Sequence, residues 1–96
     1  MTFYTLREVC EIAGIDEGFA GELVRESILV AEASPEAPER YSARMLERAR
    51  VARELIAELD VNLAGAAVIV RMREEVVELQ RGLGALAREL ERLRGA

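Results

Sequence analysis

Apolar residues recur at helical intervals along most of this 96-residue chain, which predicts a mainly helical protein. The first helical segment is residues 6–13, whose apolar face consists of Leu6, Val9, Cys10 and Ala13. Thr5 precedes the segment and Glu8 follows three residues later, an arrangement typical of a capping box. Gly14 suits the left-handed residue that ends a helix. We therefore expect a short capped helix near the N-terminus.

A second helix is predicted at residues 17–26, because Asp16 is a suitable N-cap and helical spacing resumes after it. Its predicted inward residues are Phe19, Leu23 and Val24. Two short helices joined by a tight turn indicate a helix-turn-helix, in which the second helix is the one that contacts DNA.

Extended structure is predicted on both sides of residues 31–39, a segment that contains Pro35 and Pro38. Residues 27–30, SILV, form a short β-prone run before it. Residues 40–42, RYS, follow it, and we expect Tyr41 in the core. Two short strands around a proline-containing loop indicate a β-hairpin wing.

Two further helices are predicted in the second half of the chain. Ser42 would cap a helix at residues 43–58, and Asn62 would cap a long helix that ends near Arg94. Small residues at positions 64–67 would let the long helix approach another helix closely. We therefore expect a winged helix-turn-helix domain at residues 1–61, followed by a helix at residues 62–96 for packing and dimerisation.

The long helix carries the strongest periodic pattern in the chain. Apolar residues follow one another at intervals of 3, 4, 3, 4, 3, 4 and 3: Ile69, Met72, Val76, Leu79, Leu83, Leu86, Leu90 and Leu93. We call these residues the heptad face. A heptad pattern favours self-pairing as a coiled coil, of either polarity, because leucine at every turn is unfavourable in water. The alternative is one helix that packs along its own domain and frays at its end.

Composition excludes several classes of protein. No run of 18 apolar residues is present and the N-terminus lacks the features of a signal peptide, so we expect a cytoplasmic protein with no membrane span. Cys10 is the single cysteine and there is no histidine, which argues against a metal site, and no cofactor is expected. The usual general base is therefore absent, and no glycine-rich phosphate loop follows a strand. We expect no enzymatic activity.

Charge is divided unevenly along the chain, whose net charge is −5. Residues 1–39 contain nine acidic residues and two arginines, a net charge of −7, whereas residues 40–96 contain nine acidic residues and eleven arginines. DNA affinity depends largely on cations that neutralise phosphates. An acidic helix-turn-helix and wing therefore argue against DNA as the partner.

The order of elements, together with four short sequences, resembles the MerR-like winged helix group. YTLREVCEIAGI resembles the opening helix of that group, ELVRESIL the second helix and the start of the wing, and RYS the return of the wing. The most specific piece is ELDVNLAGAAVIVRM, residues 58–72. Its Asn-Leu-Ala-Gly run after a short acidic turn is similar to the CbpM-type chaperone modulators, and also to the heat-shock repressors of the MerR-like group.

This resemblance, which covers nearly the whole chain, implies two alternative functions. MerR-like repressors bind operator DNA as dimers, with the second helix in the major groove and the wing on phosphate. CbpM-type modulators keep the domain shape but bind the J-domain of a DnaJ-like co-chaperone and restrain its activity. DNA-binding relatives typically carry threonine and arginine in the first turns of the second helix, whereas this chain reads DEGFAGELVRE there.

The residues favour a protein partner over DNA. Carboxylates are repelled by phosphate but complement a basic protein helix, such as the lysine- and arginine-rich second helix of a J-domain. We therefore expect a non-enzymatic chaperone modulator, with a MerR-like transcriptional regulator of the heat-shock repressor type as the alternative. The expected partner-binding residues are Asp16, Glu17, Glu22, Arg25 and Glu26.

An arginine cluster in the second half of the domain leaves two interpretations open. Its members Arg40, Arg44 and Arg48 would either pair with acidic residues of the second helix or of a dimer mate, or contact DNA or another anion.

Overall fold

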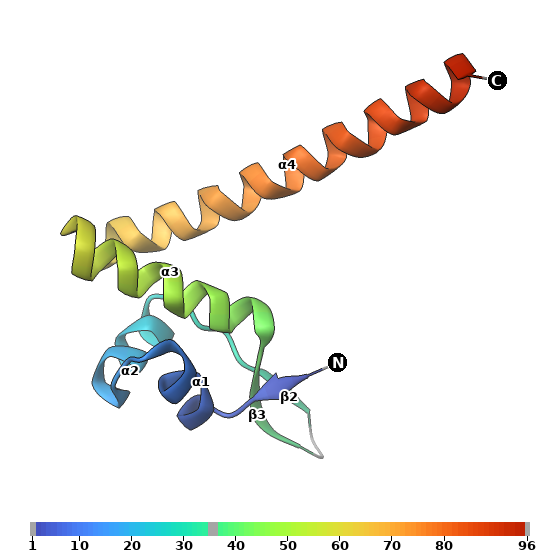
Figure 1. Ribbon diagram of the computed structural model, residues 1–96. Coiled ribbons are helices and arrows are strands. Elements are labelled where there is room, and N and C mark those ends of the chain that lie inside the picture. The colour runs from blue at the N-terminus through green and yellow to red at the C-terminus, as the bar shows by residue number, and fades with distance from the viewer. Residues whose placement is uncertain (1, 35–36, 96) are drawn as a thin grey trace.

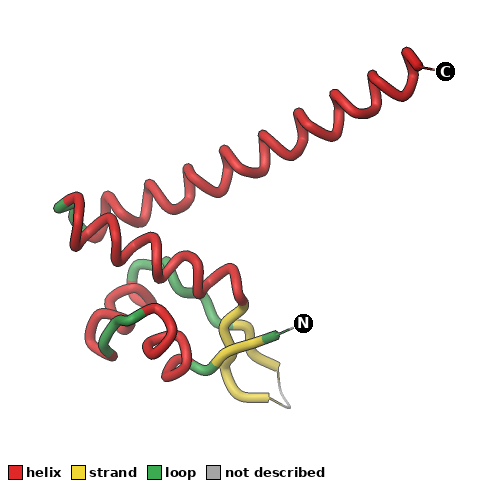
Figure 2. Tube along the Cα trace, viewed as in Figure 1, coloured by secondary structure: helices red, strands yellow, loops and turns green. Residues whose placement is uncertain are grey.

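The computed structural model describes residues 2–34 and 37–95, and it confirms a mainly helical winged helix-turn-helix fold with a long C-terminal helix (Figure 1). The elements in chain order are β1 (Phe3–Tyr4), α1 (Leu6–Ala13), α2 (Glu17–Arg25), β2 (Glu32–Ser34), β3 (Ala37–Ser42), α3 (Ala43–Leu59) and α4 (Leu63–Gly95). Helices α1 and α2 lie on one side of α3, and α4 projects away from the domain (Figure 2). The predicted loop residues Pro35 and Glu36 lie outside the described residues.

The predicted caps of α1 and α2 are confirmed. Thr5 Oγ1 accepts from the Glu8 backbone N–H at 3.1 Å, and the Thr5 N–H donates to Glu8 Oε1 at 2.9 Å, which completes the capping box. Gly14 ends α1 with φ of 69°, where a larger side chain would be strained. Asp16 Oδ1 then accepts from the Phe19 N–H at 2.7 Å and starts α2.

The inward face of α2 differs from the prediction at one position. Leu23 is fully buried as expected and Phe19 is partly buried, but Val24 is 40% exposed, so its predicted inward orientation is wrong. Ala20 is fully buried instead. Phe19, Ala20 and Leu23 form a narrow stripe toward α1 and α3, and Val24 lies beyond its edge.

The SILV segment is a turn, so the predicted strand there is wrong. Ser27 adopts a left-handed φ of 59°, and the N–H groups of Ile28 and Leu29 both donate to the Leu23 carbonyl, at 2.9 and 3.1 Å. The side chains of Ile28 and Leu29 are nevertheless buried. Their apolar character therefore reflects core packing and not strand pairing.

A wing is present as predicted, and it belongs to a three-stranded antiparallel sheet of order β1-β3-β2. Residues 32–34 and 37–39 of the predicted loop are strand, so the bounds predicted for the loop are wrong. In β3, Arg40 lies opposite Glu32 of β2, and Tyr41 lies opposite Tyr4 of β1. The sequence did not indicate β1, because two residues are too few to show an alternating pattern.

Helix α3 forms the centre of the domain. Ser42 Oγ accepts from the Met45 N–H at 3.4 Å and caps its start, and Asp60 ends it with a left-handed φ of 54°. The core cluster that α3 shares with α1, α2, the turn, β3 and α4 is Val9, Ala13, Leu23, Ile28, Leu29, Tyr41, Met45, Ala49, Ala52 and Ala67. The fully buried alanines at positions 49 and 52 let neighbouring helices approach α3 closely.

The predicted cap of α4 is confirmed, since Asn62 Oδ1 accepts from the Gly65 N–H at 2.7 Å. Ala66 and Ala67 are buried, as expected for close packing, but Ala64 is exposed. A Cβ at Gly65 would lie 3.1 Å from Asn62 Oδ1 and 3.1 Å from Val61 Cγ1. The glycine therefore makes room for the capping residues.

The second half of α4 leaves the domain. Residues 78–95 are exposed, apart from Gly84, and the heptad face ranges from 38% exposed at Ile69 to 67% at Leu83. The predicted helix at residues 63–94 is confirmed, whereas the division of the chain at residue 62 stays a prediction. Within the described residues, no helix combines the length and hydropathy needed to cross a bilayer.

Candidate functional site

The outer surface of α2 is acidic. The expected partner-binding residues lie along α2 and at its two ends, and all are exposed: Asp16, Glu17, Glu22, Arg25 and Glu26. We call these five residues the α2 face. In the wing, Glu32 and Glu39 are also exposed, while Glu36 lies outside the described residues. The surfaces that would approach phosphate in a DNA-bound winged helix therefore present mainly carboxylates.

The buried thiol of Cys10 lies close to this negative charge. Burial raises the pKa of Cys10 above its usual 9.0, and the carboxylates of Glu17, Asp16 and Glu11 raise it further. A protonated thiol is a poor nucleophile. Cys10 thus acts as a small apolar residue of the core.

A shallow groove of about 310 Å³ lies between the start of α2 and the C-terminal half of α3. The groove is lined by Gly14, Ile15, Asp16, Phe19, Arg53, Ile56 and Ala57. We call it the α2–α3 groove. Sequence reasoning missed this groove, because its two sides come from segments almost forty residues apart that lie close together only in the folded chain.

Two arginines of the predicted anion site are bound within the chain. Arg48 Nε and Nη2 donate to the two carboxylate oxygens of Glu74 at 2.8 and 2.6 Å, and Arg44 Nη2 donates to Glu74 Oε1 at 2.7 Å. The predicted ion pairing thus occurs, but the acid belongs to α4 and not to α2. These hydrogen bonds lower the pKa of Glu74 from its usual 4.5 to about 2, so the carboxylate stays charged at neutral pH.

Because of this pairing, fewer N–H groups of the arginine cluster are available to bind an anion. The Arg48 side chain is 12% exposed, and its Nη1 also donates to the Ile28 carbonyl at 3.2 Å. The Arg44 side chain is 65% exposed but shares Glu74. The Arg40 guanidinium lies 5.8 Å from the centroid of the Phe3 ring. The described geometry gives the three arginines structural partners.

A pair of arginines also joins α4 to the turn after α2. Arg71 Nη2 of α4 donates to the Glu26 carbonyl at 3.4 Å, and Arg48 holds both the Ile28 carbonyl and Glu74. The two carbonyls flank the left-handed Ser27. The end of the α2 face is therefore connected to the start of the projecting helix.

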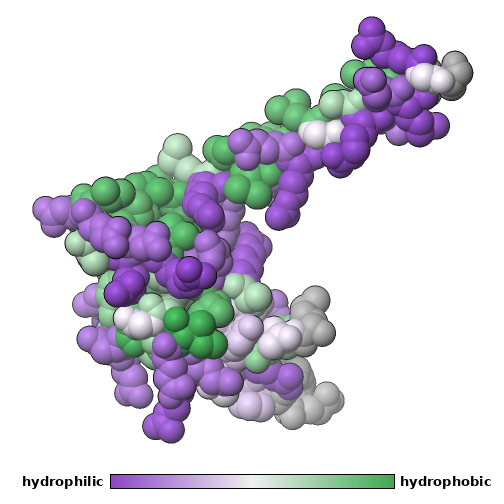
Figure 3. Space-filling view, viewed as in Figure 1, coloured by the Kyte–Doolittle hydropathy of each residue, from purple (hydrophilic) through white to green (hydrophobic). Residues whose placement is uncertain are grey.

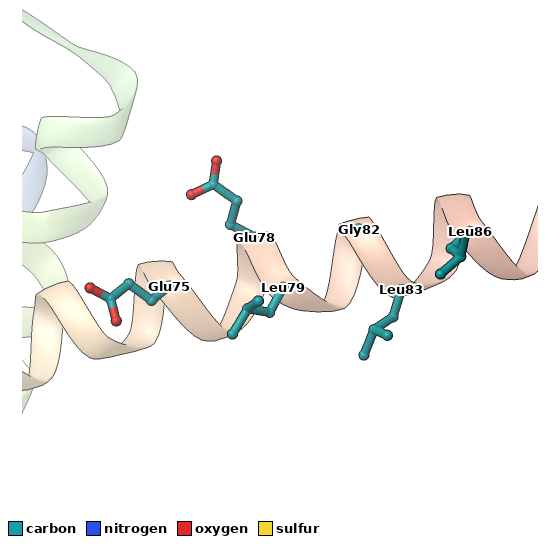
Figure 4. Close-up of a pocket in the computed structure, with 6 residues that line it drawn as sticks. All are labelled: Glu75, Glu78, Leu79, Gly82, Leu83 and Leu86. Atoms are coloured by element: carbon teal, nitrogen blue, oxygen red, sulfur yellow. The ribbon is translucent and has the colours of Figure 1, made fainter.

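The projecting helix presents its apolar residues along one side. Hydrophobic residues follow one edge of α4 and hydrophilic residues the other (Figure 3). An open space of about 550 Å³ lies beside the helix between Glu75 and Leu86, and the side chains of Leu79 and Leu83 point to the same side (Figure 4). The predicted heptad face is thus continuous and uncovered in a single chain.

Among residues 2–34 and 37–95, no three cysteine, aspartate or glutamate side chains come together as they would around a metal ion.

Comparison with known proteins gives a family match for almost the whole chain. The family described as MerR HTH family regulatory protein matches residues 4–94. This range contains α1, α2, the wing, α3 and all residues of the heptad face on α4. No curated protein and no solved structure matches the chain.

Proposed function

Because the chain belongs to the MerR HTH family of regulatory proteins, we propose that it is a non-enzymatic chaperone modulator of the CbpM type. In this proposal the protein binds the J-domain of a DnaJ-like co-chaperone and restrains its activity. The α2 face is the contact surface, and the heptad face pairs two copies of the chain.

The observation that carries the proposal is the charge of the α2 face. Glu17, Glu22 and Glu26 are exposed on the helix that would enter the major groove, and Arg25 is the one cation of that face. Clustered carboxylates oppose contact with phosphate, whereas they accelerate encounter with a basic protein helix and select for it. The Asn-Leu-Ala-Gly run at positions 62–65 is similar both to that of CbpM-type modulators and to that of the heat-shock repressors, so the choice between the two functions rests on the charge of the α2 face.

Pull-down and calorimetry with the J-domain of a DnaJ-like protein test the proposal. The full chain should bind the J-domain at low salt, and binding should weaken as salt rises. The double variant Glu17→Lys/Glu22→Lys should lose about tenfold or more in affinity, because two attractive charges become repulsive.

A matched control for this charge reversal is Glu91→Lys, an exposed position far along α4. The control should bind like the unaltered protein. Absence of binding at low salt, where charge attraction is strongest, would contradict the proposal.

Self-association is the second part of the proposal. Uncovered leucines at every turn of residues 79–93 are unfavourable in water, and a second copy of α4 carries the matching apolar residues. Light scattering of the full chain should give the mass of a dimer. A monomer at high concentration would contradict this part.

DNA binding is the alternative function, and family membership favours it. A gel shift on the DNA upstream of the protein's own gene distinguishes the two functions. Tight, sequence-selective binding with a steep salt dependence would favour a transcriptional regulator of the heat-shock repressor type over the J-domain adaptor.

A further inference from the structure

We propose that the α2–α3 groove receives an apolar side chain from a basic, amphipathic helix of the partner protein, and that this groove supplies the affinity that the charges of α2 do not. The inference rests on the proposed function, because it assumes a basic protein partner.

The groove has the composition of an anchoring site. Its surface is mostly apolar, with Ile15 and Phe19 from the α1–α2 turn and α2, and Ile56 and Ala57 from α3. Ile15, Phe19 and Ile56 are partly buried, so their exposed parts form a floor that the core holds in place. Binding energy in protein interfaces comes mainly from apolar side chains that fill such depressions, whereas exposed charges contribute mostly to encounter rate.

Charge around the groove selects the occupant. Asp16 lines the groove directly, and Glu17 follows it on the first turn of α2. The carboxylates of Glu17, Asp16 and Glu11 also raise the pKa of the Cys10 thiol on the neighbouring helix α1. Arg53 is the one cation among the lining residues, and its guanidinium lies near Gly14. An apolar residue flanked by lysine or arginine therefore fits this site better than a neutral or acidic helix.

The neighbouring surface of α2 allows close approach of a helix. Gly18 and Gly21 have ordinary helical backbones, so no left-handed turn requires glycine there. A Cβ would meet only Asp16 Oδ1 at 3.4 Å from Gly18, and only Arg25 Nη1 at 3.7 Å from Gly21. The fold thus tolerates larger residues at both positions, and their absence leaves the α2 backbone accessible on the side of the helix that carries the α2 face.

The test is to fill the groove without altering charge. Ala57 is exposed and lines the groove, so Ala57→Leu should leave the fold intact while occupying the space. In the full chain, this variant should bind the J-domain about tenfold more weakly or worse, and the loss should persist at low salt. Its thermal unfolding midpoint should stay within a few degrees of the unaltered protein.

The matched control is Ala43→Leu, another exposed alanine, at the other end of α3. This control should bind the J-domain normally. If Ala57→Leu binds the J-domain as tightly as the unaltered chain does, the groove is not a binding site for the partner. The proposed function would not be contradicted by that result. Absence of binding by the unaltered chain would overturn both.

Discussion

At the scale of single residues, Glu74 connects α4 to α3. Its carboxylate accepts from Arg44 and Arg48 of α3, and Arg48 also holds the turn after α2. Sequence alone did not reveal this pairing, because the partners are 26 and 30 residues apart and several other acids were equally available.

Replacing Glu74 should make stability depend less on pH. The folded pKa of Glu74 is about 2, below its usual 4.5, so its contribution is present above pH 4.5 and is lost as pH falls toward 2. Glu74→Gln should lower the free energy of unfolding by about 1–2 kcal/mol at pH 7, allowing for partial exposure. Urea unfolding at equal protein concentration should show this difference shrinking between pH 4.5 and 2.

Glu75→Gln is the control for this prediction, because Glu75 is the exposed neighbour and has no ion pair within the described residues. It should change stability by no more than about 0.5 kcal/mol. A constant difference between Glu74→Gln and the unaltered protein across pH would contradict the assignment.

A substitution at Gly21 should change the free energy of unfolding and the affinity for the J-domain in opposite directions. Gly21→Ala should raise the free energy of unfolding by about 0.5–1 kcal/mol, since the added methyl group meets only the flexible end of Arg25. The same variant should bind the J-domain more weakly if a partner helix approaches α2 closely. Calorimetry and chemical unfolding measure the two effects.

A matched comparison for Gly21→Ala is Gly84→Ala, which adds a methyl group near only the Arg88 Nη1 atom at 3.5 Å. It should stabilise its helix equally and leave J-domain binding unchanged. Weaker stability of Gly21→Ala would show that the fold itself requires this glycine.

At the scale of elements, residues that cap helices were the most predictable. Thr5, Asp16, Ser42 and Asn62 all cap helices where the sequence placed them, because capping depends on neighbours within three residues. The features that sequence did not predict depend on contacts between segments far apart in the chain. The SILV segment looks β-prone but forms a buried turn, and the α2–α3 groove is lined by residues that only the fold brings together.

The heptad face makes a prediction that belongs to α4 as an element. Leu83→Glu should convert the expected dimer to a monomer, because it places a charge in the middle of the apolar contact. Sedimentation velocity measures the change, and circular dichroism should show loss of helix confined to the end of the chain. Ala85→Glu, an exposed change two residues away and off the heptad face, should stay dimeric. A dimer of unchanged stability for Leu83→Glu would contradict the role of this face.

At the scale of the whole molecule, the acidic surface and the apolar surface lie on different parts of the chain. The domain carries the acidic α2 face and the groove, and the projecting helix carries the heptad face, whose surroundings are richer in arginine. Family and fold were predictable from the order of elements, and the match over residues 4–94 bears this out. The partner could not be predicted from the order of elements, because the same fold binds different partners and only the exposed surface distinguishes them.

The uncovered length of α4 has a consequence for the lifetime of the protein in a cell. An isolated helical segment of this size is only marginally stable in water, so in the proposed dimer the second copy should be what holds residues 78–95 in helical form. The proportion of ordered chain would then rise with the amount of protein synthesised. At low concentration more of the protein would be monomeric, and each monomer would present a frayed helix end to proteases. The protein would therefore be degraded faster when it is scarce than when it is abundant.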